Sequence, residues 1–346
     1  MQQDFFLYDF GEVAADQWKR LINNPVDLVG REAIQALFGL CQIKETALPE
    51  SASDYELFRA LCSISPLLLG HPLPQRLAFL LKTCLNVSLS LSSNHCDAIW
   101  TACRESLCET PMTLWDCICK TIPNTSIRCL LTPSSVSAEL PQNAEPVLDG
   151  VHLCSTTSTS WKTWENEMQV ILDSFANRGC RSVFYRLPQQ YADVEPNPYA
   201  VGQVLSKNAK GESLLFAQGF RFLSEACAHR GWTLLLLAEC RAKEAVALLE
   251  RTERTVGLPA VVWMTVAADT RDALLDFTAK AHQSTVQCGI SLADYPSDTE
   301  LDLALSVYAA RYPIGRLAVF SGGDMRHAAY ERARFQICLC KKWGVR

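Results

Sequence analysis

From residue 151 onward the chain repeats one pattern, in which a short unbroken apolar run is followed by a longer stretch with helical spacing. Strands buried on both faces, as in parallel sheets, have such continuous apolar runs. Similar runs occur at 127–131 and near the start of the chain. The predicted strands are 5–10, 127–131, 151–154, 181–185, 233–238, 260–266, 286–290 and 317–320.

About eight parallel strands joined by helical crossovers favour a (β/α)8 TIM barrel over an open sheet. The chain has 346 residues, so a barrel of roughly 250 leaves roughly 90 for something else. We expect a degenerate first barrel strand in 1–11, a mainly helical region inserted in the barrel at 12–122, and the remaining barrel in 123–346. Barrel enzymes carry their chemistry at the carboxyl ends of the strands, so candidate residues are sought there.

The helical region has recognisable boundaries. Ser53 is a plausible N-cap and Glu56 follows three residues later, which is a capping-box arrangement. Two stretches rich in Pro, Ser, Asn or Gly, 133–146 and 188–211, are predicted to be irregular, the second at the carboxyl face of the barrel. Further helices are predicted at 72–85, 96–108 and 111–120.

Composition narrows the class of protein. Hydrophobic residues make up 49% of the chain and charged residues 20%, as in ordinary soluble globules. The net charge of −5 is spread along the chain without a basic stripe, which argues against nucleic-acid binding. No apolar run reaches the roughly 20 residues that a membrane span needs.

The sixteen cysteines are interpreted as small buried apolar residues of a reducing cytoplasm. The closest pairs, Cys117-x-Cys119 and Cys338-x-Cys340, do not have zinc-site spacing, and the first residues lack the basic and apolar regions of a signal peptide. We therefore expect a cytoplasmic location and no disulfide framework.

Several motifs, in order along nearly the whole chain, resemble those of the uronate isomerases (glucuronate isomerase), a branch of the amidohydrolase superfamily. Each motif alone is short, and their joint order carries the resemblance. The matching stretches are Ser51-Ala-Ser-Asp-Tyr-Glu-Leu-Phe58, Gly70-His71-Pro72-Leu73, Gly179-Cys180-Arg181, Arg230-Gly231-Trp232, Gly257-Leu258-Pro259, Val286-Gln287-Cys288-Gly289, and Asp324-x-Arg326 followed by Arg332 and Phe335.

The resemblance implies a barrel enzyme of carbohydrate metabolism that interconverts an aldo-uronate and a keto-uronate, with D-glucuronate to D-fructuronate as the type reaction. It also implies a divalent cation, often zinc. The family's metal and substrate positions are mostly changed in this chain. The family's first-strand His-x-His is absent and only Asp9 remains there, and Leu237 stands where a later strand ends in a functional His.

Other family positions differ in the same way. Where the family has Tyr-His-Trp-Thr-His, Ser-Asp-His, a paired Trp and Arg-Pro-Asp, this chain has Pro74-Gln75-Arg76-Leu77-Ala78, Val183-Phe184-Tyr185, Ile290-Ser291-Leu292 and Thr157-Ser158-Thr159. We therefore expect no cofactor, with a divalent metal such as zinc only if the family activity is retained.

One polar pair of the family pattern survives after the last strand. Asp324 and Arg326 would be the catalytic residues, as a carboxylate for metal or proton transfer beside a cation that binds the sugar carboxylate. The alternative is that Asp324 is a helix N-cap after Gly322-Gly323 and Arg326 lies on the surface.

Four charged residues follow other predicted strands and are candidate ligand-binding residues: Arg186, Glu239, Arg241 and Asp294. Charged groups at a barrel mouth would favour a small anionic ligand.

These patterns predict a uronate isomerase-like protein that has lost its metal site and is a non-catalytic homologue, or pseudoenzyme. The alternatives are an active but unorthodox uronate isomerase using Asp324 and Arg326, and a binding protein for a small acidic sugar. The expected partners are such a sugar and either a second copy or an active isomerase, with no nucleic acid and no membrane.

Overall fold

The structure is a computed structural model. It describes residues 5–7, 18–41, 51–68, 71–121, 127–137, 139–142, 144–150, 160–207, 211–265, 268–280, 286–292, 295, 297–312, 317–321, 331, 334, 335, 337–339 and 342. The chain divides into two compact units. The barrel unit comprises Met1–Glu12, Thr125–Tyr295 and Asp302–Ser321, and the helical unit comprises Val13–Asn124, Pro296–Leu301 and Gly322–Arg346.

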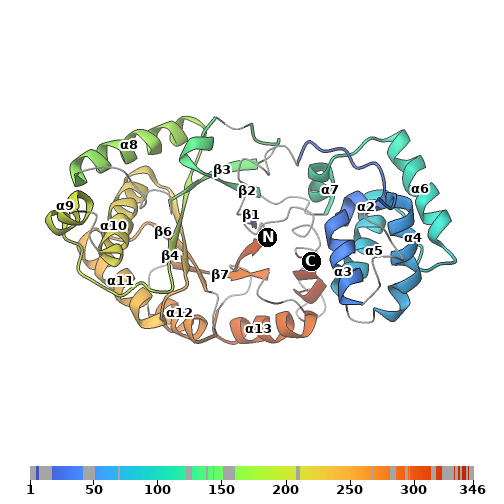
Figure 1. Cartoon of the computed structure of the whole chain (residues 1–346). Helices are drawn as coiled ribbons and strands as arrows, with labels where there is room; N and C mark the ends of the chain where they lie inside the picture. The colour runs from blue at the N-terminus through green and yellow to red at the C-terminus, as the bar shows by residue number, and fades with distance from the viewer. Residues whose placement is uncertain are drawn as a thin grey trace. The chain divides into compact units, whose positions relative to one another are not determined.

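The barrel unit is built on parallel strands that pair in chain order (Figure 1). Pairing of β1 with both β2 and β8 closes the sheet into a barrel. The mixed α/β fold with a curled parallel sheet is thus confirmed, and the arrangement is TIM-like. The strands are β1 (Phe5–Leu7), β2 (Ile127–Leu131), β3 (Ala144–Asp149), β4 (Ser182–Leu187), β5 (Thr233–Ala238), β6 (Ala260–Thr265), β7 (Val286–Ser291) and β8 (Ala318–Ser321).

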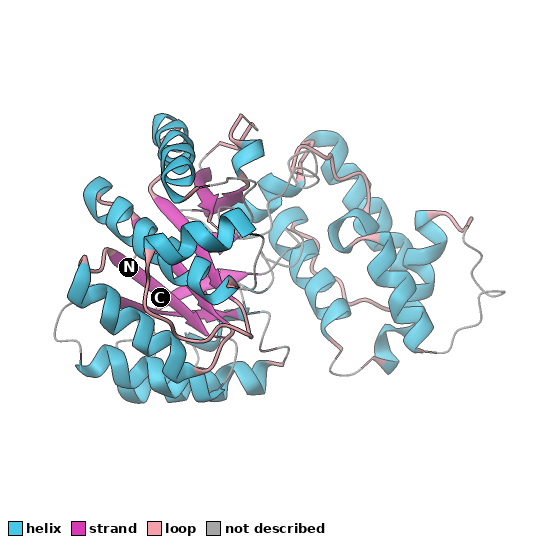
Figure 2. Ribbon diagram, turned by 60° about the vertical axis from the view of Figure 1, so that its left-hand side comes forward, coloured by secondary structure: helices cyan, strands magenta, loops and turns pink. Residues whose placement is uncertain are grey.

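Helices surround the strands of this unit (Figure 2). The hydroxyl of Tyr185 on β4 donates to the carbonyl of Phe216, and that of Tyr308 donates to the carbonyl of Gly289 on β7. Tyrosine hydroxyls thus hydrogen-bond strands to helices through backbone carbonyls. The helices are α8 (Trp161–Asn177), α9 (Pro198–Lys207), α10 (Glu212–Arg230), α11 (Ala242–Thr255), α12 (Ala268–Lys280) and α13 (Asp298–Arg311), with a short 3-10 helix at Pro133–Ser135.

The barrel interior is filled by apolar side chains. Alternate residues of β2–β6 and β8 face inward, and these side chains form one buried cluster. Its members are Leu130, Val147, Phe184, Leu235, Leu237, Val262, Met264, Ala318 and Phe320.

At the amino ends of β2, β3 and β4, the positions two residues before Leu130, Val147 and Phe184 are polar. They carry Arg128, Glu145 and Ser182. There Arg128 forms an ion pair with Glu145 (Nε to Oε2, 3.4 Å) and donates to the Ser182 hydroxyl at 3.2 Å. The apolar interior is thus bounded by a polar layer at this end.

Two predictions about the barrel region are wrong in part. The expected irregular stretch 133–146 includes the first residues of β3, which begins at Ala144. The predicted strand 151–154 lies outside the described residues. The second irregular stretch, 188–211, contains helix α9 in its second half.

The helical unit confirms the predicted helices closely. The side chain of Ser53 accepts from the backbone N–H of Glu56 while Glu56 accepts from that of Ser53, which is the expected capping box. Tyr55 and Phe58 pack their rings on Trp100 of the next helix but one. The helices are α2 (Pro25–Val29), α3 (Arg31–Leu40), α4 (Asp54–Ile64), α5 (Pro72–Leu85), α6 (Cys96–Glu109) and α7 (Leu114–Thr121), with a 3-10 turn at Ser65–Leu67.

The C-terminal segment contributes buried charge to this same unit. Glu331 and Arg334 have relative exposures of 6% and 4%. Arg76 on α5 lies 3.9 Å from Glu331, and Arg334 lies 3.1 Å from Asp298. These pairs connect segments far apart in the sequence within one unit.

The cysteines are mostly buried, as predicted, but the expectation of no disulfide is wrong at one pair. Cys84 and Cys117 are bonded to each other. Of the other described cysteines, Cys41 and Cys108 are exposed, Cys119 is half-buried and the rest are buried thiols. Among the described residues, no helix is long and apolar enough to cross a membrane.

Candidate barrel-mouth site

Two of the predicted ligand-binding residues meet at the carboxyl end of the barrel interior. Arg186 lies two residues beyond the inward-facing Phe184 on β4, and Glu239 lies two residues beyond Leu237 on β5. Because side chains two residues apart share a face of a strand, both project on the interior side. The register pairs Arg186 with Leu237, so the two charged groups come from adjacent strands.

Arg186 and Glu239 form an ion pair. The Nη2 atom of Arg186 lies 2.5 Å from Oε1 of Glu239. The backbone N–H of Glu239 donates to the carbonyl of Leu187 at 3.0 Å, which extends the β4–β5 ladder by one step. Half of the Arg186 side chain is exposed, so the guanidinium is accessible from outside while one edge is held by a carboxylate.

A third charged residue at this end, Asp149, was missed by the sequence analysis. It is the last residue of β3, lies two residues beyond the inward-facing Val147, and is 8% exposed. Its register partner is Phe184 on β4. A carboxylate directly after an apolar run was the available signal, but the strand was predicted a few residues too late.

The remaining predicted site residues are not brought to this pair by the described contacts. Arg241 is the residue before α11 and binds Glu244 of the same helix at 2.7 Å, with two thirds of its side chain exposed. The predicted catalytic residues Asp324 and Arg326, and also Asp294 and Asp9, lie outside the described residues.

The segment after β4 is anchored to α11. Arg251 donates to both carboxylate oxygens of Asp193, at 2.7 and 2.5 Å, and to the carbonyl of Val194 at 2.7 Å. The backbone N–H of Asp193 donates to Glu244 at 2.8 Å, and this bond lowers the pKa of Glu244. A loop tied at both backbone and side chain is held in one position beside the barrel mouth.

Burial controls the chemistry of the neighbouring tyrosine and thiols. Tyr191, at 2% exposure, has a raised pKa because of burial and then the negative charge of Asp193. Burial raises the pKa of Cys129 and Cys288 on the barrel strands to about 12, so both are neutral thiols near pH 7.

The divalent metal implied by the resemblance does not fit the described strand ends. Catalytic zinc needs three protein ligands such as His, Asp or Glu converging on one ion. The inward positions on β4–β6 carry Phe184, Leu235, Leu237, Val262 and Met264. Within the described ranges, no group of three or more His, Cys, Asp or Glu residues could hold a metal ion.

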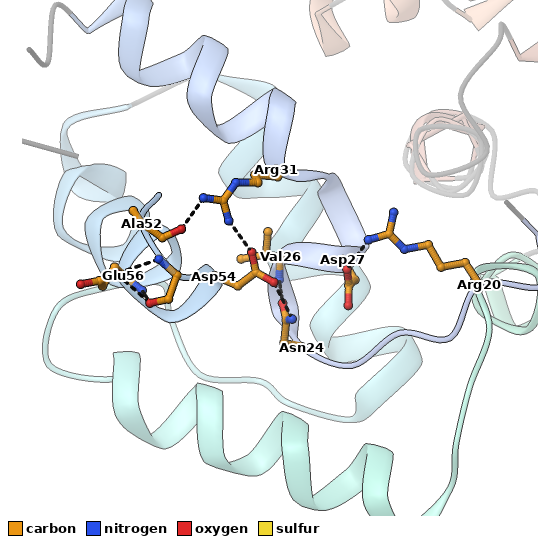
Figure 3. A network of polar contacts seen from close by, with 9 residues as sticks. Arg20, Asn24, Val26, Asp27, Arg31, Ala52, Asp54 and Glu56 are labelled. Atoms are coloured by element: carbon orange, nitrogen blue, oxygen red, sulfur yellow. Dashed lines mark hydrogen bonds and ion pairs between the residues drawn. The ribbon is translucent and has the colours of Figure 1, made fainter. Parts of the chain in front are cut away.

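The helical unit has a small cavity of its own, of about 130 Å³. Arg31 donates to Asp54 at 2.9 Å and also to the carbonyl of Ala52, and Asn24 donates to the other Asp54 oxygen at 3.0 Å (Figure 3). Arg20 binds Asp27 at 3.1 Å on the opposite side. Both arginines that line this cavity are thus paired with carboxylates, Arg20 with Asp27 and Arg31 with Asp54.

Comparison with known proteins gives structural neighbours only. No protein-family model matches the chain, and no curated protein matches its sequence. Among crystal structures, the chain resembles uronate isomerase from Thermotoga maritima, with a TM-score of 0.74 and 12% identity over 100% of this chain and 89% of that one. It also resembles glucuronate isomerase from Caulobacter crescentus, with a TM-score of 0.63 and 11% identity over 99% and 87% of the two chains. At these identities the similarity establishes a shared fold.

Proposed function

We propose that this chain is a divergent (β/α)8 member of the uronate isomerase family that does not catalyse the family reaction. The carrying observation is the set of inward side chains on β4–β6. Phe184 and Leu237 are buried apolar residues at strand positions where the family resemblance places Ser-Asp-His and a functional His. The fold similarity to uronate isomerases supports the family, and the apolar interior supports loss of the chemistry.

The isomerisation requires polar groups at the site where it occurs. Moving a hydrogen between adjacent carbons of a uronate needs a base and a group that stabilises the charge developing on the enediolate oxygens. The side chains of Phe184 and Leu237 offer neither a donor nor a cation for that charge. A carboxylate such as Asp324, without further polar groups, cannot perform both roles at once.

The test is an isomerase assay of the full chain on D-glucuronate and D-galacturonate, with and without added zinc or manganese. Folding is verified by circular dichroism, and Asp324→Asn is assayed beside the wild-type chain. We expect no turnover above background for either protein. Metal-dependent turnover that disappears in Asp324→Asn would overturn the proposal in favour of an unorthodox active isomerase.

A second candidate function is binding of a small acidic sugar, and it is favoured by one observation. The guanidinium of Arg186 is half exposed at the barrel mouth and has a planar edge that suits a carboxylate. Glu239 competes for that guanidinium, so a uronate would bind by displacing or sharing this partner. Calorimetric titration with D-glucuronate tests this role, with Arg186→Met as the loss variant and Arg241→Met as the matched control.

A further inference from the structure

The Cys84–Cys117 bond joins two helices of the helical unit. Cys84 lies in the last turn of α5 and Cys117 in the middle of α7, with Cα atoms 5.5 Å apart and a separation of 33 positions in sequence. Both residues are buried, with relative exposures of 5% and 3%. The bond therefore closes a long segment of chain around the interface of α5 and α7.

The two helices are held together at this point by a contact that does not require the bond. The ammonium group of Lys120 on α7 donates to the carbonyl of Cys84 at 3.2 Å. Because this contact involves no sulfur atom, we expect it to remain when the bond is reduced. It keeps two thiols close to each other and ready to be oxidised again.

The other described cysteines provide a contrast within the same unit. Cys62 on α4 and Cys96 at the start of α6 are hydrogen-bonded neighbours, yet both are free thiols. Cys103, about two turns later on α6, is also free and buried. Many unpaired cysteines are typical of proteins in a reducing environment. In such an environment, a single disulfide would form and break as the ratio of oxidised to reduced small thiols changes.

We propose that Cys84 and Cys117 form a reversible redox cross-link that stabilises the helical unit when oxidised. A low-molecular-weight disulfide is the oxidant. One protein thiolate attacks it to give a mixed disulfide and releases one small thiol; the second protein thiolate then displaces the other small thiol. The protein loses two electrons and two protons and gains one S–S bond, while the small disulfide becomes two thiols.

The expected consequence is a change in stability without unfolding. Closing a segment of this length removes conformational freedom from the unfolded chain, and we expect a rise in Tm of roughly 5–10 °C on oxidation. In the reduced state, the Lys120 contact and the buried packing of α5 on α7 keep the native arrangement. The cross-link thus stabilises the packing of α7 on α5. Helix α7 is the last helix before β2 in the chain.

The experiment equilibrates the full chain in buffers with graded ratios of reduced to oxidised glutathione. Free thiols are then blocked with N-ethylmaleimide under denaturing conditions, and the linked peptides are identified by mass spectrometry while Tm is measured in parallel. Cys84→Ala and Cys117→Ala remove the pair, and Cys103→Ala is the matched control with an equally buried thiol.

We expect the Cys84–Cys117 peptide to increase gradually with the oxidised fraction, and Tm to increase with it in the wild-type chain and in Cys103→Ala. Neither change should occur in Cys84→Ala or Cys117→Ala. Three results would overturn the proposal: thiols that stay reduced at every ratio, a bond that survives reduced glutathione alone, or a Cys62–Cys96 bond forming instead.

Discussion

A Cβ atom on Gly289 would lie 2.7 Å from Cε2 of Phe320 and 3.0 Å from Cγ of Met264. The ring of Phe320 therefore occupies the space that a side chain on β7 would need. Glycine is required here because of close approach, since the backbone itself adopts an ordinary strand conformation. The side chains of Met264 on β6 and Phe320 on β8 thus fill the barrel interior beside Gly289 of β7.

Gly289→Ala should destabilise the barrel by about 1–3 kcal/mol, because Phe320 and Met264 must move to admit the methyl group. The measurement is the thermal midpoint and the urea midpoint of the variant. Gly202→Ala on α9 is the matched control, because a Cβ there meets nothing within 4 Å. The control should be neutral or slightly stabilising, and equal effects at both sites would contradict the packing argument.

Glu239→Gln should strengthen binding of D-glucuronate if the barrel mouth is an acidic-sugar site, because the carboxylate that competes for Arg186 becomes neutral. A change of about 1 kcal/mol, or roughly fivefold in Kd, is expected for one charge-assisted contact. Calorimetry is the measurement. Arg186→Met should abolish binding, while stability should change little in either variant because half of the Arg186 side chain is exposed to solvent, which screens the pair.

Arg251→Met should release the segment after β4 from α11. The carboxylate of Asp193 loses two charge-assisted bonds, and the Val194 carbonyl loses a third contact. We expect faster hydrogen–deuterium exchange over residues 190–197 and a decrease of about 1–3 kcal/mol in the free energy of unfolding. Arg254→Met on the same helix, whose side chain bonds only the Glu250 carbonyl within its own helix, should leave exchange in this segment unchanged.

The helical unit should become less stable in mild acid because His71 is protonated more readily in the unfolded chain than in the folded one. Its Nδ1 atom accepts from the backbone N–H of Leu73 as the N-cap of α5, and burial followed by the charge of Arg76 lowers its pKa. The contribution to stability is fully present above the unfolded pKa near 6.5 and is lost as the pH falls towards the folded pKa, because the unfolded chain takes up the proton first.

The comparison that isolates this effect is Tm against pH from 8 to 5 for the wild-type chain and His71→Asn. Asparagine retains an N-cap oxygen that does not titrate. The wild-type Tm should fall more steeply below about pH 6.5. Parallel curves for the two proteins would mean that His71 does not couple folding to protonation.

The elements predicted best from the sequence have strong local signals. Helix α5 and strand β5 match the predicted boundaries, because one begins at Pro72 and the other is a run of leucines between Trp232 and Glu239. Strand β3 was misplaced for a physical reason. Glu145 and Pro146 interrupt its apolar run, and Glu145 is polar because it pairs with Arg128 at the amino end of the barrel interior.

The candidate site was predictable only as far as strand ends could be located. Arg186 lies near the end of β4 and Glu239 directly follows β5, and both strands were predicted within two residues, so the meeting of these side chains could be anticipated. Asp149 ends the misplaced strand β3. The contact between Arg251 and Asp193 spans 58 residues and leaves no local pattern in the sequence. Long-range polar contacts of this kind depend on how helix and loop pack, and only the folded chain reveals them.

The helical unit is built from both the early and the last parts of the chain, with Arg76 on α5 near Glu331. During synthesis on the ribosome, α2–α7 emerge long before the segment that carries Glu331 and Arg334. This unit would therefore wait in an incomplete state, with Arg76 lacking its contact to Glu331, until the segment that carries Glu331 leaves the exit tunnel. The unit that is translated first would be finished last, and chaperones would meet it in that interval.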